Sequence, residues 1–203
     1  MDPRQLDRFF RVLAKGVASP VTVILTGAGA GVLWGHVRPS LDVDFAVRLA
    51  RRSDAAWKQF ERAAQTASKL TGLAVNYAED IDRWGSITLL DYQRHTHLVR
   101  HIGQLTVRTL DPAYWTIGKL SRYLDPDVQD LVAVLKRKRI PSARLIRLWA
   151  RALRRSPRSL ACTQFRDHVQ DFLKTYGRRL WGKTFDAEEA IRAFLRQARL
   201  HEG

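Results

Sequence analysis

The chain has 203 residues, with 35 Lys and Arg against 20 Asp and Glu, so its formal net charge is +15. This length allows one sizeable domain, or a core domain with a helical annex. No apolar run approaches the ~20 residues that cross a bilayer, and the polar start "MDPRQLDRFF" does not resemble a secretory signal. With Cys162 as the single cysteine, which excludes an internal disulfide, we expect a cytoplasmic protein.

Helix starts are indicated mainly by Asp-Pro pairs, in which aspartate caps the helix and proline takes the first turn. A capping-box-like pair, Asp186 with Glu189, predicts the start of the last helix. The other expected helices run from residue 2 to about 15 and from 53 to 70, and two more begin at residues 111 and 125.

Strands are predicted by short apolar runs between turn residues. They cover residues 21–26, 41–47, 73–79, 86–92 and 104–110. The chain after residue 111 has helical periodicity throughout. We therefore expect an α+β protein: a mixed β-sheet flanked by helices in a core at residues 1–140, and a basic helical C-terminal domain at residues 141–203.

The segment "VILTGAGAGVLWGHVRPSLDVDFAV" (residues 23–47) combines a glycine turn with two aspartates. It is no dinucleotide fingerprint, because Val32 and Trp34 occupy the place of the third glycine in the two registers of G-x-G-x-x-G. The letters of the P-loop pattern G-x-x-x-x-G-K-[ST] occur at residues 177–184, but this segment lies in the helical C-terminal part with no predicted strand before it, as a P-loop would require. Both of these nucleotide sites are therefore excluded.

Asp42 and Asp44 have the spacing of two side chains on one face of a strand. Ionised carboxylates side by side repel each other unless a cation lies between them, and Mg²⁺ (or Mn²⁺) prefers such oxygen ligands. A glycine turn before a short helix offers backbone N–H groups to phosphate. The pattern indicates a site for a nucleoside triphosphate (NTP) with a bridging metal ion, and the alternative is a strand start with solvated acids.

Two motifs in the same order resemble one family. Residues 38–44, Arg-Pro-Ser-Leu-Asp-Val-Asp, fit the R-x-[ST]-x-D-x-D pattern that follows a glycine turn and a short helix in the nucleotidyltransferase (polymerase-β-like) superfamily. Further along, "IGKLSRYLDPDVQDLVAVL" resembles the K-x-x-R…D-x-x-D helices of nucleotidyltransferase toxins of the abortive-infection AbiEii type. The resemblance covers roughly residues 22–135.

This resemblance implies roles for particular residues. Asp42 and Asp44 would hold catalytic magnesium, and Lys119 would neutralise charge on the leaving group. A third carboxylate is expected on a later strand, with Asp91 as the candidate ahead of Asp80 and Asp82. The residues that would bind the nucleotide are Gly27, Ala28, Arg38, Ser40, Lys119 and Arg122, with Asp127 and Asp130 in support.

Two features leave alternatives open. The family usually carries Gly-Gly or Gly-Ser where this chain has Gly27-Ala28, so one hydroxyl contact to the triphosphate is missing. Lys119 is expected on a helix surface, where its removal would weaken NTP binding and leave the fold intact. The other interpretation of Lys119 with its two aspartates is an interhelical salt bridge without a substrate.

The positive charge is concentrated in one part of the chain. Residues 131–166 contain no acid, and arginines recur there at steps of three and four, which places them along one stripe of a helix. Such a stripe can follow a phosphate backbone, although it could also be a solvated face. A membrane-surface helix is disfavoured, because the apolar residues of these helices are needed for a core. The expected nucleic-acid contacts are Arg144, Arg147, Arg151 and Arg154.

The expected activity is transfer of a nucleoside monophosphate from an NTP to a hydroxyl acceptor, with RNA first and tRNA 3′ ends as the most specific choice. The family resemblance further suggests the toxin of a toxin–antitoxin pair, with an antitoxin protein as partner. Two alternatives stay open: a catalytically silent module that binds nucleic acid or a partner protein, and an enzyme that nucleotidylates protein.

Overall fold

The computed structural model describes residues 1–35 and 40–199. In these residues the chain has an α+β fold, with one mixed five-stranded sheet and flanking helices, as the sequence predicts. It divides into two compact units: unit 1 contains residues 1–81 and 93–111, and unit 2 contains residues 82–92 and the chain from residue 112 onward. The expected boundary between residues 140 and 141 falls inside unit 2.

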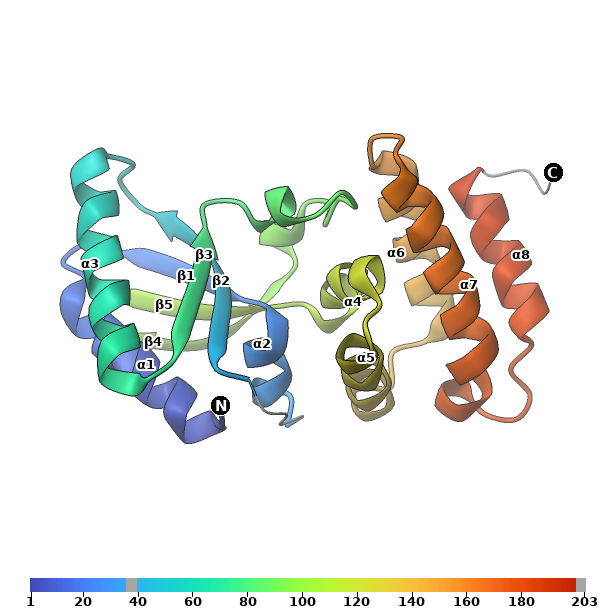
Figure 1. Cartoon of the computed structure of the whole chain (residues 1–203), viewed down its shortest axis with the longest axis horizontal. Helices are drawn as coiled ribbons and strands as arrows, with labels where there is room; N and C mark the ends of the chain where they lie inside the picture. The colour runs from blue at the N-terminus through green and yellow to red at the C-terminus, as the bar shows by residue number, and fades with distance from the viewer. Residues whose placement is uncertain (36–39, 200–203) are drawn as a thin grey trace. The chain divides into compact units, whose positions relative to one another are not determined.

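Unit 1 holds the sheet and the first three helices (Figure 1). Asp2 caps α1, because its carboxylate accepts the N–H groups of Arg4 and Gln5 at 2.7 and 2.9 Å. The elements are α1 (Pro3–Gly16), β1 (Val21–Leu25), α2 (Gly27–Leu33), β2 (Asp42–Leu49), α3 (Asp54–Thr71), β3 (Ala74–Ala78), β4 (Thr96–Ile102) and β5 (Leu105–Leu110).

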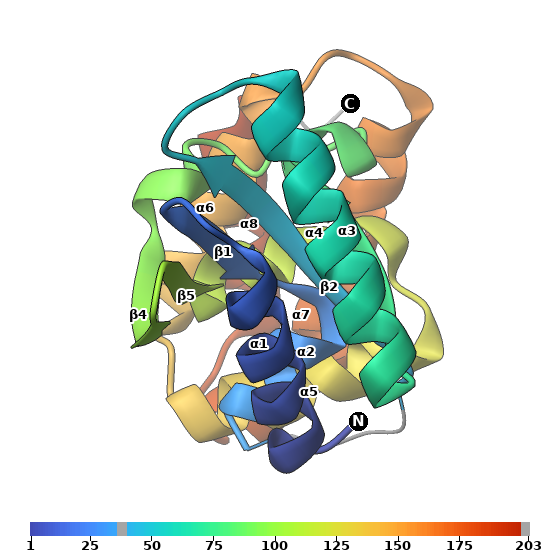
Figure 2. The ribbon, with the colours of Figure 1, turned by 90° about the vertical axis from the view of Figure 1, so that its left-hand side faces the viewer.

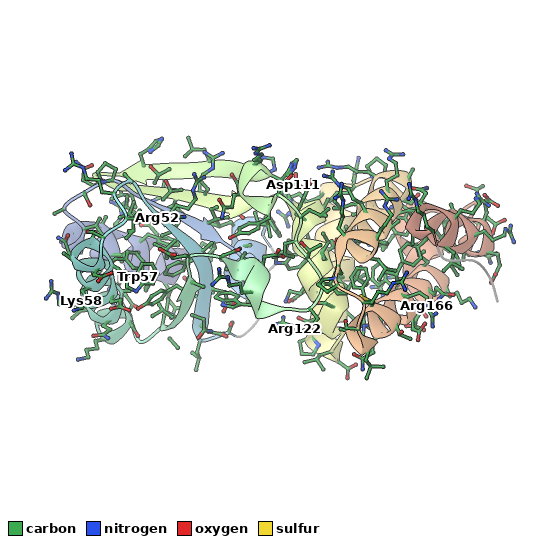
Figure 3. All side chains as sticks on the ribbon, turned by 90° about the horizontal axis from the view of Figure 1, so that it is seen from above. Arg52, Trp57, Lys58, Asp111, Arg122 and Arg166 are labelled. Atoms are coloured by element: carbon green, nitrogen blue, oxygen red, sulfur yellow. The ribbon has the colours of Figure 1, made fainter. Side chains whose placement is uncertain are left out.

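Helix α3 begins and ends where its sequence indicates. The Ser53 hydroxyl accepts the N–H of Ala56 at 3.2 Å at its start, and Gly72 ends it with a left-handed φ of 70°. Trp57, labelled in Figure 3, donates its indole N–H to Glu61 at 2.9 Å one turn along the helix. The inner face of α3, toward the sheet, is formed by its buried residues Phe60, Ala63, Ala64 and Ala67.

The strand order of the sheet is β3-β2-β1-β5-β4. β1 is antiparallel to β2 and parallel to β5, β2 is parallel to β3, and β4 and β5 form an antiparallel pair. Because side chains alternate along each strand, the register assigns every residue to one of two faces. The core and the candidate site lie on opposite faces of this sheet.

Helices α1 and α3 cover the apolar face, as Figure 2 shows. On this face Val23 pairs with Val47, and Phe45 lies on the same side of β2. The ring of Phe45 is 6.2 Å from Phe9 of α1 and 6.2 Å from Phe60 of α3, measured between centroids. Burial of these aromatic rings is a main source of stability for unit 1.

Unit 2 is helical, apart from the loop of residues 82–92. Its core contains Trp149, Phe165, Phe172 and Phe194, which are all fully buried. The indole N–H of Trp149 donates to Thr116 Oγ1 at 2.8 Å, which satisfies a polar group inside the core. The helices are α4 (Pro112–Arg122), α5 (Asp125–Lys138), α6 (Ser142–Arg155), α7 (Leu160–Trp181) and α8 (Ala187–Ala198).

Two predictions about local structure are wrong. Residues 86–92 form no strand: the alternation of Ile87 and Leu89 reflects burial, while side-chain and turn bonds take the place of a strand ladder. The N-cap of α5 is Leu124, not Asp125. Asp125 lies in the first turn, where its negative charge interacts favourably with the helix dipole. The last helix begins as predicted, with the Asp186 carboxylate accepting the N–H of Glu189 at 2.9 Å.

None of the helices in the described part of the chain combines the length and apolar character that a membrane crossing requires.

Candidate functional site

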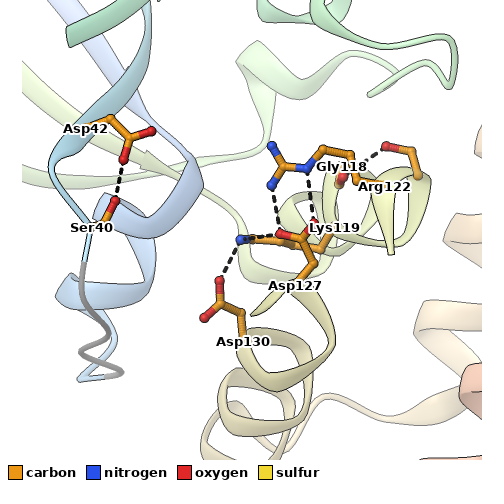
Figure 4. A network of polar contacts seen from close by, with 8 residues as sticks. Ser40, Asp42, Gly118, Lys119, Arg122, Asp127 and Asp130 are labelled. Carbon is orange, nitrogen blue, oxygen red and sulfur yellow. Dashed lines mark hydrogen bonds and ion pairs between the residues drawn. The ribbon is translucent and has the colours of Figure 1, made fainter. Parts of the chain in front are cut away.

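Asp42 and Asp44 lie on one face of β2, as predicted. Val43 between them points into the core and is fully buried, whereas both carboxylates are partly exposed. Asp42 accepts a short hydrogen bond from the Ser40 hydroxyl (Figure 4). Asp44 Oδ1 accepts from the side-chain amide of Asn76 on β3 at 3.0 Å. Both acids are therefore oriented by neighbouring polar groups.

The glycine turn lies directly against the second carboxylate. Gly27 has a left-handed φ of 58°, and a Cβ at this position would come within 1.9 Å of Asp44 Oδ2. Only glycine fits this backbone conformation and this close approach. The N–H of Thr26 also donates to the carbonyl oxygen of Asp44 at 2.9 Å. Ala28 is buried in the first turn of α2, and it brings no hydroxyl to the site.

The donor set at this end of β2 suits a hard divalent cation. It consists of carboxylate oxygens, with the Ser40 hydroxyl beside them, and Mg²⁺ is bound in proteins through one or two carboxylates together with waters and substrate phosphates. No group of three or more His, Cys, Asp or Glu side chains that could hold a metal ion occurs in residues 1–35 and 40–199. The pair fits a magnesium ion that also binds a phosphate ligand.

The third carboxylate is not where the sequence predicts it. Asp91 is exposed in a bend of unit 2 and lies on no strand, because residues 86–92 form a loop. Asp82 lies in that same loop, where its carboxylate accepts hydrogen bonds from the Thr88 hydroxyl at 3.0 Å and from the N–H of Leu89. Asp80 comes just after β3 and has a partner of its own.

Sequence reasoning missed Asn76, which occupies the neighbouring strand beside Asp44. The register pairs Asp44 with Asn76, so both side chains lie on the same face of the sheet. The other β3 residues on that face are Ala74 and Ala78, so this face of β3 carries an amide and no carboxylate. The alternation within residues 73–79 predicts that Asn76 lies on the same face of its strand as Ala74 and Ala78. It does not predict that this strand pairs with β2.

Lys119 is buried, which contradicts the expected position on a helix surface. Lys119 is 2% exposed, and its ammonium group donates hydrogen bonds to Asp127 Oδ1 at 2.9 Å and to Asp130 Oδ2 at 2.6 Å (Figure 4). The ammonium also lies 5.1 Å from the centroid of the Trp115 ring. The structure therefore contains the interhelical salt bridge between α4 and α5 that was the alternative interpretation.

Arg122 completes this cluster from the outer side. Its guanidinium makes a two-pronged contact with Asp127, at 3.1 and 2.7 Å, while 59% of its side chain is exposed. Burial raises the pKa of Asp127, but hydrogen bonds from Arg122 and Lys119 outweigh burial and hold the pKa below its usual value of 3.8. Asp127 is therefore charged at neutral pH, and Arg122 is the member of the cluster that an anionic ligand could reach.

The expected arginine stripe lies on the outer face of α6. All four arginines are exposed, and the residues between them, such as Leu145, Leu148 and Ala152, are buried. One of the four is partly engaged, since Arg154 donates to the carbonyl oxygen of Gln197 at 2.6 Å. Arg147 and Arg151 make no hydrogen bond or ion pair with the described residues. We call these four residues the arginine face: Arg144, Arg147, Arg151 and Arg154.

The structure thus joins most of the residues predicted for nucleotide binding and catalysis into two groups. Unit 1 brings Gly27, Ser40, Asp42 and Asp44 together, and unit 2 brings Lys119 and Arg122 together with their two aspartates. Asp91 belongs to neither group. Arg38, the remaining predicted nucleotide contact, lies outside the described residues.

Comparison of the chain with protein-family models, with curated proteins and with solved structures finds no match. The resemblance to nucleotidyltransferases accordingly rests on the sequence motifs.

Proposed function

We propose that this protein is a magnesium-dependent nucleotidyltransferase that transfers a nucleoside monophosphate from an NTP to a hydroxyl group. The observation that carries the proposal is the contact between Gly27 and the carboxylate of Asp44, with Asp42 on the same strand face. A turn that only glycine can form lies beside a pair of oriented carboxylates. Phosphate, backbone N–H groups and a cation can meet at such a place.

The reaction would form a bond between the acceptor oxygen and the α-phosphorus and break the bond from that phosphorus to the β-bridging oxygen. Pyrophosphate leaves, and the acceptor proton passes to solvent. Magnesium, when bound, would neutralise the phosphate charges and lower the pKa of the acceptor hydroxyl. Asp42 and Asp44 would hold the ion, Ser40 would orient Asp42, and Gly27 would admit the triphosphate close to the backbone.

The first test is binding of Mg–NTP, measured by calorimetry. The variant Asp42→Asn with Asp44→Asn keeps the shape of both side chains and removes their charge. It should lose binding, and unchanged binding would refute the metal site. Asp54→Asn is the matched control, since this exposed acid belongs to α3, which covers the opposite face of the sheet, and the variant should bind Mg–NTP as the unmodified chain does.

We further propose RNA as the acceptor, with tRNA 3′ ends as the most specific candidate, for a cytoplasmic toxin controlled by an antitoxin protein. The exposed arginine face of α6 supports a polyanionic acceptor. Incubation with each labelled NTP, magnesium and either total RNA or cell lysate identifies the acceptor. Label on RNA supports this proposal, and label on protein shows that the acceptor is a protein hydroxyl.

The arginine face has its own test in the salt dependence of RNA affinity. Replacing Arg147 and Arg151 with Gln should flatten the slope of log affinity against log salt by about 0.7 for each lost single-strand phosphate contact. Arg178 and Arg179 on α7 are also exposed, so their replacement with Gln is a control that removes the same charge. Equal slopes for the two double variants would show that the arginines of α6 contact RNA no more than other exposed arginines do.

A catalytically silent module is the second candidate, and Asn76 is the observation that favours it. An amide cannot accept the acceptor proton or hold a second cation as a third carboxylate would. Binding of Mg–NTP without transfer to any acceptor would support this candidate. In that case Asn76→Asp should add the missing carboxylate beside Asp44, and a gain of transfer would identify the cause of the silence.

A further inference from the structure

The loop of residues 82–92 in unit 2 has an exposed tip on a buried base. Residues 83–86 are exposed, and Ile87 and Leu89 behind them are buried. The tip carries Arg83 and Trp84, and the Trp84 residue is 47% exposed. Among the described residues, Trp84 makes no hydrogen bond and no ring contact. A large flat side chain is thus held at the surface beside a positive charge.

The base of this loop is closed by its own hydrogen bonds. Asp82 accepts Thr88 Oγ1 at 3.0 Å and the N–H of Leu89, and the N–H of Leu90 donates to Thr88 Oγ1 at 3.1 Å. Trp84 is only two residues from Asp82, so the closed base restricts where its ring can go. A ligand that bound this ring would not have to order the loop first, which favours affinity.

The same loop is tied to the end of α6. The N–H of Thr88 donates to Ser156 Oγ at 2.9 Å, and the Ser156 hydroxyl donates in turn to the carbonyl of Ala152 at 2.8 Å. Ser156 is buried and is the C-cap of α6. Figure 1 shows the loop, drawn green after β3, reaching toward that end of the helix. Two further arginines outside the arginine face, Arg155 and Arg158, precede and follow Ser156 in the sequence and are exposed.

An exposed aromatic ring and a row of exposed cations within one compact unit suit one class of ligand. Proteins bind single-stranded nucleic acid by placing its backbone along a basic surface and stacking its bases on aromatic rings. A duplex offers the same phosphates, but its bases are already stacked on each other and cannot reach a protein ring. The arginine face alone would accept both forms, whereas the exposed ring distinguishes them.

We propose that unit 2 binds single-stranded RNA, with phosphates along the arginine face of α6 and a base stacked on Trp84. This inference deepens the proposed function, because it specifies the acceptor as an unpaired RNA segment. Arg83 would contact the phosphate next to the stacked base.

The test compares RNA affinities of full-length variants by fluorescence anisotropy, with a labelled single strand of about 12 nucleotides and its duplex. Trp84→Ala should weaken binding of the single strand about 5- to 150-fold, which corresponds to one lost base stack. Trp84→Phe keeps a ring and should retain most of the affinity. Leu124→Ala, which removes an exposed apolar side chain from the same unit, is the control and should bind normally.

Tryptophan emission provides a second readout that a purely structural role would not change. RNA should quench part of the emission of the unmodified protein, and this part should be missing in Trp84→Phe. A loss below about five-fold in Trp84→Ala, or equal affinity for single strand and duplex, would overturn the inference. Selective capture of a protein instead of RNA would also overturn it. Loss of Mg–NTP binding or of transfer would refute the proposed function alone, since RNA binding is measured without NTP.

Discussion

Removal of the Lys119 charge should destabilise unit 2 more than any other single change on its surface or in its polar clusters. Lys119→Met keeps the aliphatic stem over Trp115 and deletes the ammonium group. Asp127 and Asp130 are 2% and 1% exposed, so two buried carboxylates lose their shared cation. Asp127 keeps its contact with Arg122, whereas Asp130 loses this ion pair outright.

Breaking a buried ion pair from one side costs about 3–5 kcal/mol, because the remaining charge stays away from water. At about 2–4 °C per kcal/mol for a chain of this size, the melting temperature should fall by about 6–20 °C. Circular dichroism during heating and urea unfolding measure this loss. Asp130→Asn is the companion variant: in a double-mutant cycle the combined variant should be less destabilised than the sum of the two single changes.

The result that would refute this reasoning is a Lys119→Met variant that melts within about 2 °C of the unmodified protein and no longer binds NTP. Lys119 would then act mainly as a phosphate contact, as the family resemblance implies. If the variant is strongly destabilised and its folded fraction binds NTP normally, Lys119 is a structural residue of the α4–α5 pair. In that case Arg122 is the residue to test for phosphate contact.

Gly27→Ala puts a methyl group onto the Asp44 carboxylate at a positive φ, and strain of this kind costs about 1–3 kcal/mol. Gly72→Ala has a similar φ with open space around it, so urea unfolding should show a loss of only about 1 kcal/mol. Asn76→Asp should tighten Mg²⁺ binding in calorimetry and lower the melting temperature when the ion is removed. Despite burial, cationic partners hold the pKa of Asp127 below 3.8, so melting temperatures in a pH series should fall only below about pH 4.

The sequence by itself determined most of the local structure. Asp2, Ser53 and Asp186 mark helix starts because their side chains can bond free N–H groups within the next three residues. The spacing of Asp42 and Asp44 was enough to place both on one strand face, and Val43 between them in the core. These features depend on residues close in sequence, so pattern and spacing alone define them.

Only the tertiary structure decided which distant residues share an environment. Strand pairing placed Asn76 beside Asp44, and side-chain bonds made residues 86–92 a loop, although their alternation is that of a strand. The same holds for Lys119: charged residues at three-residue spacing look alike on an exposed helix face and at a helix–helix contact. Packing of α4 against α5 buries Lys119 with two carboxylates. Burial, which sets the strength of an ion pair, depends on contacts between segments that the local sequence does not specify.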